Sequence, residues 1–344
     1  MRRKALVTGG MGYIGSNTVA ELQNSGYHVV IVDNLSNSRK FIVDRIERIS
    51  GIRPVFYEAD ICSKKQLATI FETEKNFDVV VHFAAFKAVG ESLILPLKYY
   101  NNNLSALLNL LNFMQAFQCN KILFSSSATV YGNPDKLPVK ETALKKALSA
   151  YGSTKLMGED ILEKVVATGS INAISLRSFN PVGAHVSALI GQLPLGVPNN
   201  LMSVIAQTAI GKQKQFLVFG LYYPTPDGSC LRDYIHVVDL AKAHVKSCDR
   251  LINSKQKNNY EVFNVGTGKG ISVMEIIKAF EEYNQLKVNY KISVRRPGDA
   301  ASVFADNFLA LKELDWRPEL GLKKMVTTAW RWELALNRHK MNYI

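Results

Sequence analysis

Tyr151 and Lys155, in the segment "YGSTK", have the residue types and the spacing that could support proton transfer. On a helix, positions i and i+4 share one face, so the lysine ammonium can lie beside the tyrosine phenol. Free tyrosine has a pKa of about 10, and a nearby positive charge favours the phenolate, which can then act as a base near neutral pH. The spacing alone does not establish this chemistry, because Tyr283 and Lys287 share it.

The segment "FSSSATVYG" supplies a third polar group, Ser127, near the end of an apolar, strand-like run. Ligands of open α/β sheets bind outside the carboxyl ends of the strands, where a serine can face a tyrosine on the following helix. Ser127 would then hydrogen-bond the reacting oxygen or relay its proton. For Ser127 taken alone, capping of the local backbone explains the residue equally well.

Glycines in "VTGGMGYIG" follow the first strand-like run and open the first helix-like one. The spacing of Gly9, Gly12 and Gly15 lets the backbone turn tightly and approach a pyrophosphate at a helix N-terminus. Asp33 ends the second apolar run, where a carboxylate accepts hydrogen bonds from ribose hydroxyls and repels a 2′-phosphate. The combination predicts an NAD site and favours NAD over NADP. A second cluster, "GTGKG" at residues 266–270, lacks such an acidic partner and is interpreted as a turn.

The elements that must position these residues alternate along the first half of the chain. Helix-like stretches separate the apolar runs "KALVTGG", "HVVIVD", "RPVFYEAD", "FDVVVHFAA" and "KILFSSSATVYG". The runs are typical of parallel strands covered on both faces, and the alternation predicts an α/β fold with a doubly wound, Rossmann-type parallel sheet. Beyond residue 180 the pattern changes, and residues 183–235 are loop-rich, with Gly and Pro. We expect an NAD-binding Rossmann domain over residues 1–180 and a smaller α/β C-terminal substrate domain over residues 181–344, with some segments returning to the first.

The composition of the 344 residues, 47% apolar and 21% charged, is that of an ordinary globular protein. The net charge of +13 comes from dispersed basic residues without a nucleic-acid-binding motif. It therefore predicts a solvated basic surface or a small anionic substrate, and no nucleic-acid partner. The four cysteines have no metal-binding spacing, so no metal is expected. The lack of a signal-peptide pattern and of an apolar run long enough to cross a bilayer predicts a cytoplasmic protein with no membrane partner.

Over nearly its whole length the chain resembles the extended short-chain dehydrogenase/reductase family, and within it the UDP-glucose (UDP-galactose) 4-epimerases. The glycine loop and the Tyr–Lys pair carry the wider resemblance, while "FSSSATVYG", "NPVGAH", "VPNNLM" and "RDYIHV" carry the narrower one. The resemblance implies an NAD-dependent isomerase that oxidises carbon 4 of a UDP-hexose, lets the keto sugar rotate and reduces it on the opposite face. It also implies a homodimer formed through two helices of the first domain. The stretch "LSALLNLLNFMQAF" is a candidate for one of them, although a buried core helix explains it equally well.

The resemblance also assigns roles to individual residues through the matching motifs. The catalytic residues would be Ser127, Tyr151 and Lys155. The cofactor would be contacted by Gly9, Gly12, Tyr13, Ile14, Gly15, Asp33, Asn34, Asn37, Ser38, Asp60, Ile61, Phe83, Ala84, Ala85, Lys87, Asn102, Ser125, Tyr151, Lys155 and Phe179. The substrate would be contacted by Ser127, Tyr151, Asn180, Asn200, Leu201, Phe219, Arg232, Tyr234, Arg296, Asp299 and Val303. Arginine suits the diphosphate because its guanidinium can hold two phosphate oxygens at once.

Several positions depart from relatives within this family. Sugar-nucleotide 4,6-dehydratases place an Asp-Glu pair where this chain has Ala128 and Thr129, which cannot transfer a proton, so elimination of water is not expected. Ser178 stands where the family commonly has tyrosine, and Gln192 and Leu193, before Pro194, stand where it has two acids.

Val303 stands where many glucose/galactose epimerases have tyrosine, beside the 2-substituent of the hexose. The smaller valine leaves room for an N-acetyl group, so we expect activity on UDP-galactose and also on the UDP-GlcNAc/UDP-GalNAc pair. Two alternatives remain open. One is an epimerase acting mainly on UDP-N-acetylhexosamines or UDP-uronic acids. The other is a non-catalytic NAD-binding regulator, although such proteins typically lose the Tyr–Lys pair.

Overall fold

The structure is a computed structural model that describes residues 3–193, 195–196, 198, 200–296 and 299–339. Pro194 and two residues of the "VPNNLM" motif, Val197 and Asn199, lie outside the described residues, as do Pro297 and Gly298, which stand between Arg296 and Asp299. Within the described chain, no helix combines the length and the apolar character needed to span a membrane.

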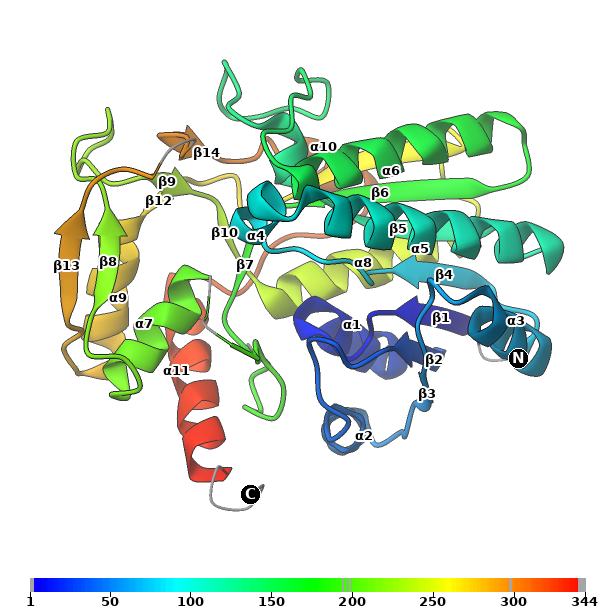
Figure 1. The fold of residues 1–344 in the computed structure, drawn as a ribbon, viewed down its shortest axis with the longest axis horizontal. Helices are drawn as coiled ribbons and strands as arrows, with labels where there is room; N and C mark the ends of the chain where they lie inside the picture. The colour runs from blue at the N-terminus through cyan, green and yellow to red at the C-terminus, as the bar shows by residue number, and fades with distance from the viewer. Residues whose placement is uncertain (1–2, 194, 197, 199, 297–298, 340–344) are drawn as a thin grey trace.

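A parallel sheet of seven strands forms the larger part of the molecule (Figure 1). The strand order across it is β11-β6-β5-β4-β1-β2-β3. Strands β2 and β3 are added on one side of β1, and β4, β5, β6 and β11 on the other, which is the order of a doubly wound fold. The predicted Rossmann-type α/β fold is therefore confirmed. The strands are β1 (Lys4–Thr8), β2 (His28–Asp33), β3 (Val55–Glu58), β4 (Val79–His82), β5 (Lys121–Ser127), β6 (Asn172–Ser178) and β11 (Tyr260–Val265).

Helices cover both faces of this sheet, because successive side chains of each strand point to opposite sides. In β1, Ala5 and Val7 pack into one core with α1 (Tyr13–Asn24), α2 (Ile42–Ser50) and α8 (Val237–Ile252). Leu6 packs into the opposite core with α3 (Lys64–Glu74), α5 (Pro96–Ala116) and α6 (Ala150–Ala167). Two short helical segments, α4 (Val89–Ile94) and a 3-10 turn over Ala128–Tyr131, lie in loops that follow the carboxyl ends of β4 and β5.

The smaller part of the molecule consists of short strands and helices from the C-terminal half of the chain (Figure 1). Two parallel pairs join β7 (Asn180–Val182) to β10 (Tyr234–His236) and β8 (Phe216–Phe219) to β13 (Tyr290–Ser293). A third small sheet has the order β12 (Ile271–Ser272), β9 (Leu231–Arg232), β14 (Ser302–Val303). The helices of this part are α7 (Leu201–Ala209), α9 (Val273–Asn284) and α11 (Leu322–His339), whereas α10 (Phe308–Glu313) packs into the core of the large sheet through Ala310. A core of its own packs α7, α9 and α11 together with β8.

The chain passes between the two parts more than once. Strand β11 pairs with β6 in the large sheet, and α8 packs into the same core as α1. The division at residue 180 stays a prediction. Within residues 183–235, expected to be loop-rich, the structure also forms α7 and β8, because apolar side chains such as Met202 and Ile205 are buried there.

Candidate active site

The turn between β1 and α1 is built from glycine because no side chain fits there. Gly9 has a φ of +71°, and a Cβ on it would lie 2.7 Å from the backbone nitrogen of Ala84. A Cβ on Gly15 would lie 2.2 Å from the carbonyl oxygen of Gly9. Gly12, the N-cap residue just before α1, provides no side-chain cap, so the turn is a bare helix N-terminus that a phosphate can approach closely.

Asp33 at the end of β2 is held in place by three donors. Its carboxylate accepts hydrogen bonds from the backbone nitrogens of Met11 (3.0 Å) and Leu35 (2.9 Å) and from the hydroxyl of Ser38 (2.9 Å). Burial raises the pKa of Asp33, and these hydrogen bonds oppose that effect because they favour the carboxylate. The bond from Met11 ties the carboxylate to the glycine turn, which fits the recognition of a dinucleotide whose ribose and pyrophosphate lie close together.

The other predicted cofactor residues lie along the carboxyl edge of the sheet or in the loops that leave it. Tyr13 is in the first turn of α1 and donates to the carbonyl of Gly183 (2.6 Å). Lys87 is exposed in the loop before α4, and Asn102 is on α5, where its amide donates to Asn103 (2.9 Å). The remaining predicted residues follow strand ends: Ile14 and Gly15 after β1, Asn34 and Asn37 after β2, Asp60 and Ile61 after β3, Phe83, Ala84 and Ala85 after β4, Ser125 near the end of β5, and Phe179 after β6.

Local structure brings Tyr151 to the end of β5. Ser149 caps α6 by accepting a hydrogen bond from the backbone nitrogen of Gly152 (3.1 Å), which places Tyr151 in the first turn of the helix. Gly152 also allows close approach of the turn after β5, because a Cβ there would lie 3.0 Å from the carbonyl oxygen of Thr129. Ser127 ends β5 and accepts a hydrogen bond from the backbone of Thr129 (3.2 Å). The serine therefore caps a local turn and also lies within hydrogen-bonding reach of Tyr151.

Lys155 lies one turn further along α6 and is 5% exposed. Its ammonium donates to the carbonyl of Ser125 (2.7 Å) and lies 4.7 Å from the centre of the Phe124 ring. The ring of His82 stacks on Phe124 at 5.8 Å between ring centres. Burial, together with the smaller effect of the Lys155 charge, lowers the pKa of His82 to about 3, so this histidine is neutral at working pH. The ammonium of Lys155 is thus held in place by the Ser125 carbonyl and lies beside the uncharged ring of Phe124.

The electrostatics of the pair differ in part from the sequence-based expectation. Burial raises the pKa of Tyr151, and the hydrogen bond with Ser127 counteracts this rise. Burial also lowers the pKa of Lys155 to about 8, while the carboxylate of Glu159 works in the opposite direction. In the polypeptide alone, burial therefore outweighs the effect expected from the ammonium, and the pKa of Tyr151 lies above its ordinary value. A further positive charge at the site would favour the phenolate.

On the substrate side, the predicted residues form two groups. In the first, the guanidinium of Arg296 pairs with Asp299 (2.9 Å) and lies 4.7 Å from the ring centre of Phe219, at the end of β8. Asn200 and Leu201 stand at the start of α7. The cationic, acidic and aromatic groups of the first group are those expected to contact phosphate, ribose and base.

The second group surrounds the end of β5. Val303 in β14 is in parallel register with Arg232 in β9, and it packs against the cluster that contains Phe179 and Ala128. Asn180 in β7 is exposed and is the register partner of buried Tyr234 in β10. Val303 thus packs against the same buried cluster as Ala128, the residue that follows Ser127.

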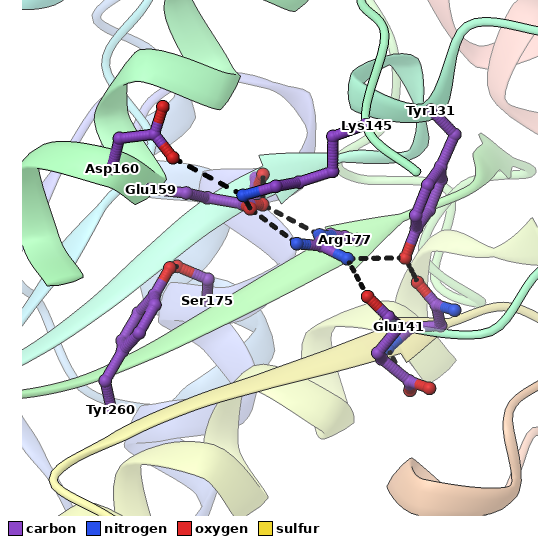
Figure 2. A network of polar contacts seen from close by, with 10 residues as sticks. Tyr131, Glu141, Lys145, Glu159, Asp160, Ser175, Arg177 and Tyr260 are labelled. Carbon is purple, nitrogen blue, oxygen red and sulfur yellow. Dashed lines mark hydrogen bonds and ion pairs between the residues drawn. The ribbon is translucent and has the colours of Figure 1, made fainter. Parts of the chain in front are cut away.

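Two buried acidic residues that organise the site were missed from the sequence. Asp233 accepts hydrogen bonds from the backbone of Thr267, Gly268 and Ala305 and so ties the "GTGKG" turn to β9 and β14. Glu159 accepts from Ser126 (2.6 Å) and pairs with Arg177 (Figure 2). The sequence signal for both is a charged residue among apolar neighbours. For Asp233 it is the aspartate itself in "RDYIHV", and for Glu159 it is its partner Arg177 in "ISLRSF".

Positions set aside in the sequence behave differently from the site. Lys287 lies beyond the end of α9, so it does not share a helix face with Tyr283. Ser178 donates to the carbonyl of Ser126 (3.0 Å), which gives the position a hydrogen bond in place of a ring. The side chain of Gln192 accepts from Ser203 (2.9 Å). Among the described residues, no group of histidine, cysteine, aspartate and glutamate side chains could hold a metal ion.

The chain is similar to known proteins over nearly its whole length. A family model described as GDP-mannose 4,6 dehydratase matches residues 6–329. The UDP-glucose 4-epimerase of Bacillus subtilis (strain 168) is 48% identical over 329 residues, covering 95% of this chain and 96% of that protein.

Solved structures show the same relationship. The UDP-glucose 4-epimerase of Stenotrophomonas maltophila, crystallised with NAD and formylated UDP-arabinopyranose, superposes with a TM-score of 0.94 at 48% identity, covering 98% of this chain and 99% of that chain. The enzyme of Bifidobacterium longum, in complex with NAD+ and UDP, superposes with a TM-score of 0.92 at 45% identity, covering 96% and 98%. The chain belongs to the UDP-glucose 4-epimerases, within the larger family that the GDP-mannose 4,6 dehydratase model describes.

Proposed function

We propose that this protein is an NAD-dependent isomerase that interconverts UDP-glucose and UDP-galactose at carbon 4. The observation that carries the proposal is the position of Ser127, Tyr151 and Lys155 beside a glycine turn at one edge of a parallel sheet. Ala128 and Thr129 follow Ser127 and offer no acid or base, so the site supports oxidation and reduction without loss of water. A tyrosine–lysine pair with a purely structural role would have no reason to lie at the carboxyl edge of the sheet, where ligands of such folds bind.

The residues of the chain have distinct tasks in this reaction. The phenolate of Tyr151 accepts the proton of the 4-hydroxyl and returns one to the same oxygen after the sugar has turned. Ser127 hydrogen-bonds that oxygen, and the ammonium of Lys155 favours the phenolate through its charge. NAD, when bound at the glycine turn and Asp33, supplies the acceptor and donor of hydride for carbon 4.

The diphosphate and uridine are the fixed end of the substrate in this proposal. Arg296 and Arg232 bind phosphate oxygens, Asn200 donates to the diphosphate, and Asp299 accepts from the uridine ribose. The pairing of Arg296 with Asp299 at 2.9 Å keeps both side chains directed to one place. Anchoring the nucleotide lets the hexose rotate without leaving the site. Residues 1–180 then form the NAD-binding part and residues 181–344 the UDP-sugar-binding part, except for α8 and β11.

The site also favours a second pair of substrates, UDP-N-acetylglucosamine and UDP-N-acetylgalactosamine. Val303 is half-buried against the cluster with Phe179, close to the end of β5, and it is smaller than the tyrosine of many relatives. We propose that the space beside Val303 accepts the N-acetyl group on carbon 2 of the sugar.

We further propose a homodimer in the cytoplasm. Leu107 and Leu110 of the apolar α5 stretch are buried in the core, whereas Leu97 and Leu108 on the same helix are 73% and 46% exposed. Met157 on neighbouring α6 is 42% exposed. A second copy of the chain could cover these exposed side chains, and light scattering during size-exclusion chromatography would measure the mass of the assembly.

Proton NMR of the reaction mixture tests the proposed activity. Purified protein, without and with added NAD, is mixed with UDP-galactose and, separately, with UDP-N-acetylgalactosamine. The signals of the 4-epimer should appear in both samples. Conversion of UDP-galactose alone would retain the epimerase and remove the N-acetyl proposal, and conversion of neither, even with NAD, would contradict the activity.

A further inference from the structure

A buried ionic network joins α6 to β6 (Figure 2). Glu159 on α6 and Arg177 on β6 are 1% and 3% exposed. They form a bidentate ion pair, with nitrogen–oxygen distances of 2.9 and 2.6 Å. The third guanidinium nitrogen of Arg177 donates to the Tyr131 hydroxyl (2.7 Å) and to the carbonyl of Glu141 (2.8 Å). Tyr131 in turn donates to Asn264 of β11 (2.6 Å).

The network reaches the catalytic residues through two short connections. The hydroxyl of Ser126, adjacent to Ser127 in β5, donates to Glu159 at 2.6 Å. Glu159 is also one helical turn after Lys155 on α6, so both side chains lie on the same side of the helix. A single carboxylate therefore contacts the strand that carries Ser127 and lies close to the ammonium that acts on Tyr151.

We propose that Glu159, held by Arg177, is a positioning residue of the active site that fixes the end of β5 against α6 and stabilises the ammonium form of Lys155. The inference rests on the proposed function, because it assigns the pair a role in the same proton transfer. The hydrogen bonds that the structure gives Glu159 are with Ser126 and Arg177, neither of which is a predicted cofactor or substrate residue. Its effect on the site is therefore exerted through Ser126 and through its charge near Lys155.

The charged and titratable groups around Lys155 and Glu159 come from several elements. Lys155 is faced by Glu159 of its own helix and by the neutral His82 of β4, and Tyr151 lies one helical turn before it on α6. Glu159 is faced by Arg177 of β6, by Lys145 at 3.7 Å and by the phenol of Tyr260 on β11. Lys145 also forms an ion pair with Asp160 (3.4 Å), so its positive charge is divided between Glu159 and Asp160. Glu159 is the negative group that acts on Lys155 in this set.

The key variant is Glu159→Gln, which retains the shape of the side chain and removes its charge. The lysine then loses a neighbour that favours its ammonium, so its pKa should fall, and the alkaline limb of the kcat profile should move down by about 0.5 to 1 pH unit. Because an unpaired Arg177 can prevent folding, the double variant Glu159→Gln with Arg177→Gln is made as well. It should show the same direction of shift with a smaller amplitude.

Two conservative variants separate charge from geometry. Glu159→Asp keeps the charge but shortens the side chain, so it should lower kcat several-fold while leaving the alkaline limb within about 0.2 pH unit of wild type. Ser126→Ala removes the hydroxyl that Glu159 accepts and keeps the ion pair, so the limb should again stay in place. Only loss of the carboxylate charge should move it.

The chain offers a matched control in a second buried pair. Arg250 on α8 binds Glu261 on β11 through distances of 2.6 and 2.9 Å, and both side chains are also buried. Glu261 is paired in register with Ile174, in the amino-terminal half of β6, whereas Arg177 is paired with Asn264 near the carboxyl end. Glu261→Gln should lower the melting temperature to a similar extent as Glu159→Gln and leave the pH profile of kcat unchanged.

A titration that needs no turnover distinguishes failure of this inference from failure of the proposed function. The ammonium of Lys155 can be followed by nitrogen NMR of lysine-labelled protein, with its signal assigned by its absence in Lys155→Met. It should deprotonate at lower pH in Glu159→Gln than in wild type, because the carboxylate that favours the charged form is gone. An unchanged lysine titration and unchanged pH profiles in both charge variants, with melting losses equal to that of Glu261→Gln, would overturn the positioning role. An inactive wild type with a shifted lysine titration would leave the pair intact and reject the epimerase.

Discussion

The two sides of the site are built in different ways. On the sheet side, Lys155 is 5% exposed and its ammonium is bonded to Ser125 within the edge of a seven-stranded sheet. On the substrate side, the Arg296 side chain is 57% exposed and stands in a loop between strands of sheets with two or three members. The reacting groups are held rigidly, and the groups expected to bind the nucleotide stand on smaller elements.

The difference has a physical reason. Proton transfer requires a phenol and an ammonium within fixed distances, which packing in a large core provides. Burial also changes the pKa values of Tyr151 and Lys155, an effect that an exposed site could not produce. A phosphate, by contrast, can be bound by a flexible guanidinium that stays hydrated until the substrate arrives. Variants on the sheet side should therefore affect kcat, and variants on the substrate side should affect KM or selectivity.

The largest effect is expected for Tyr151→Phe. Removing the phenolic oxygen eliminates the group that accepts the proton, so kcat should fall by about 10²- to 10⁴-fold, the contribution of a positioned acid or base. Steady-state assays with UDP-galactose measure it, and the melting temperature should stay close to that of wild type. The control is Tyr283→Phe, an exposed tyrosine on α9, which should retain full activity. A Tyr151→Phe enzyme with more than half of the wild-type kcat would contradict the assignment.

A smaller loss is expected for Lys155→Met, because the phenol remains. The pKa of Lys155 is lowered by burial to about 8, so wild-type activity should decline as the pH rises through that value and the ammonium is lost. In Lys155→Met, kcat should fall by about 10²-fold, and the decline near pH 8 should disappear. Lys287→Met serves as the control, since that side chain is 89% exposed. If the alkaline limb persisted in Lys155→Met, another group would be responsible for it.

On the substrate side, Arg296→Met should raise KM and leave kcat within about twofold of wild type. A hydrogen bond to a charged group contributes about 1.5 to 3 kcal/mol, which corresponds to a rise in KM of about 10- to 100-fold. Initial rates at a series of UDP-galactose concentrations measure both constants. Arg53→Met, which breaks an exposed ion pair with Asp44 and Glu47, should change neither. An equal drop of kcat in Arg296→Met would place this arginine on the chemical side of the comparison.

The smallest effect is expected for Val303→Tyr, which changes selectivity. The larger ring should fill the space proposed for the N-acetyl group, so the ratio of kcat/KM for UDP-N-acetylgalactosamine to that for UDP-galactose should fall by about 10-fold. Val303→Ile, a modest increase in size at the same position, should shift the ratio less. An unchanged ratio in Val303→Tyr would reject the role of this position in selectivity.

The elements with local signals could be predicted from the sequence. The Val- and Ile-rich runs indicated the parallel strands, and the glycine spacing indicated the turn into which no side chain fits at Gly9 or Gly15. Segments returning to the first domain were expected, but the place of β11 beside β6 depends on a long connection that leaves no local pattern. The sign of the change in the Tyr151 pKa depended on burial, which spacing does not reveal.

Contacts between distant segments could not be predicted either. Glu159 and Arg177 are close because α6 packs beside β6, and Asp233 reaches the turn at Thr267 and Gly268 from a separate strand. Each charged side chain is visible in the sequence, but its partner is chosen by the packing of elements that periodicity does not place relative to one another. The hydrogen bonds of Glu159 and of Asp233 could therefore be identified only in the structure.

The most direct test of oxidation and reduction at carbon 4 uses UDP-galactose that carries deuterium on that carbon, converted in ordinary water. In the proposed reaction hydride leaves carbon 4 and returns to it, while Tyr151 exchanges only the hydroxyl proton. The UDP-glucose formed should therefore retain the deuterium at carbon 4, as measured by NMR and mass spectrometry. Epimerised product that has lost the deuterium to water would contradict the account, because it would show removal of a proton from carbon 4.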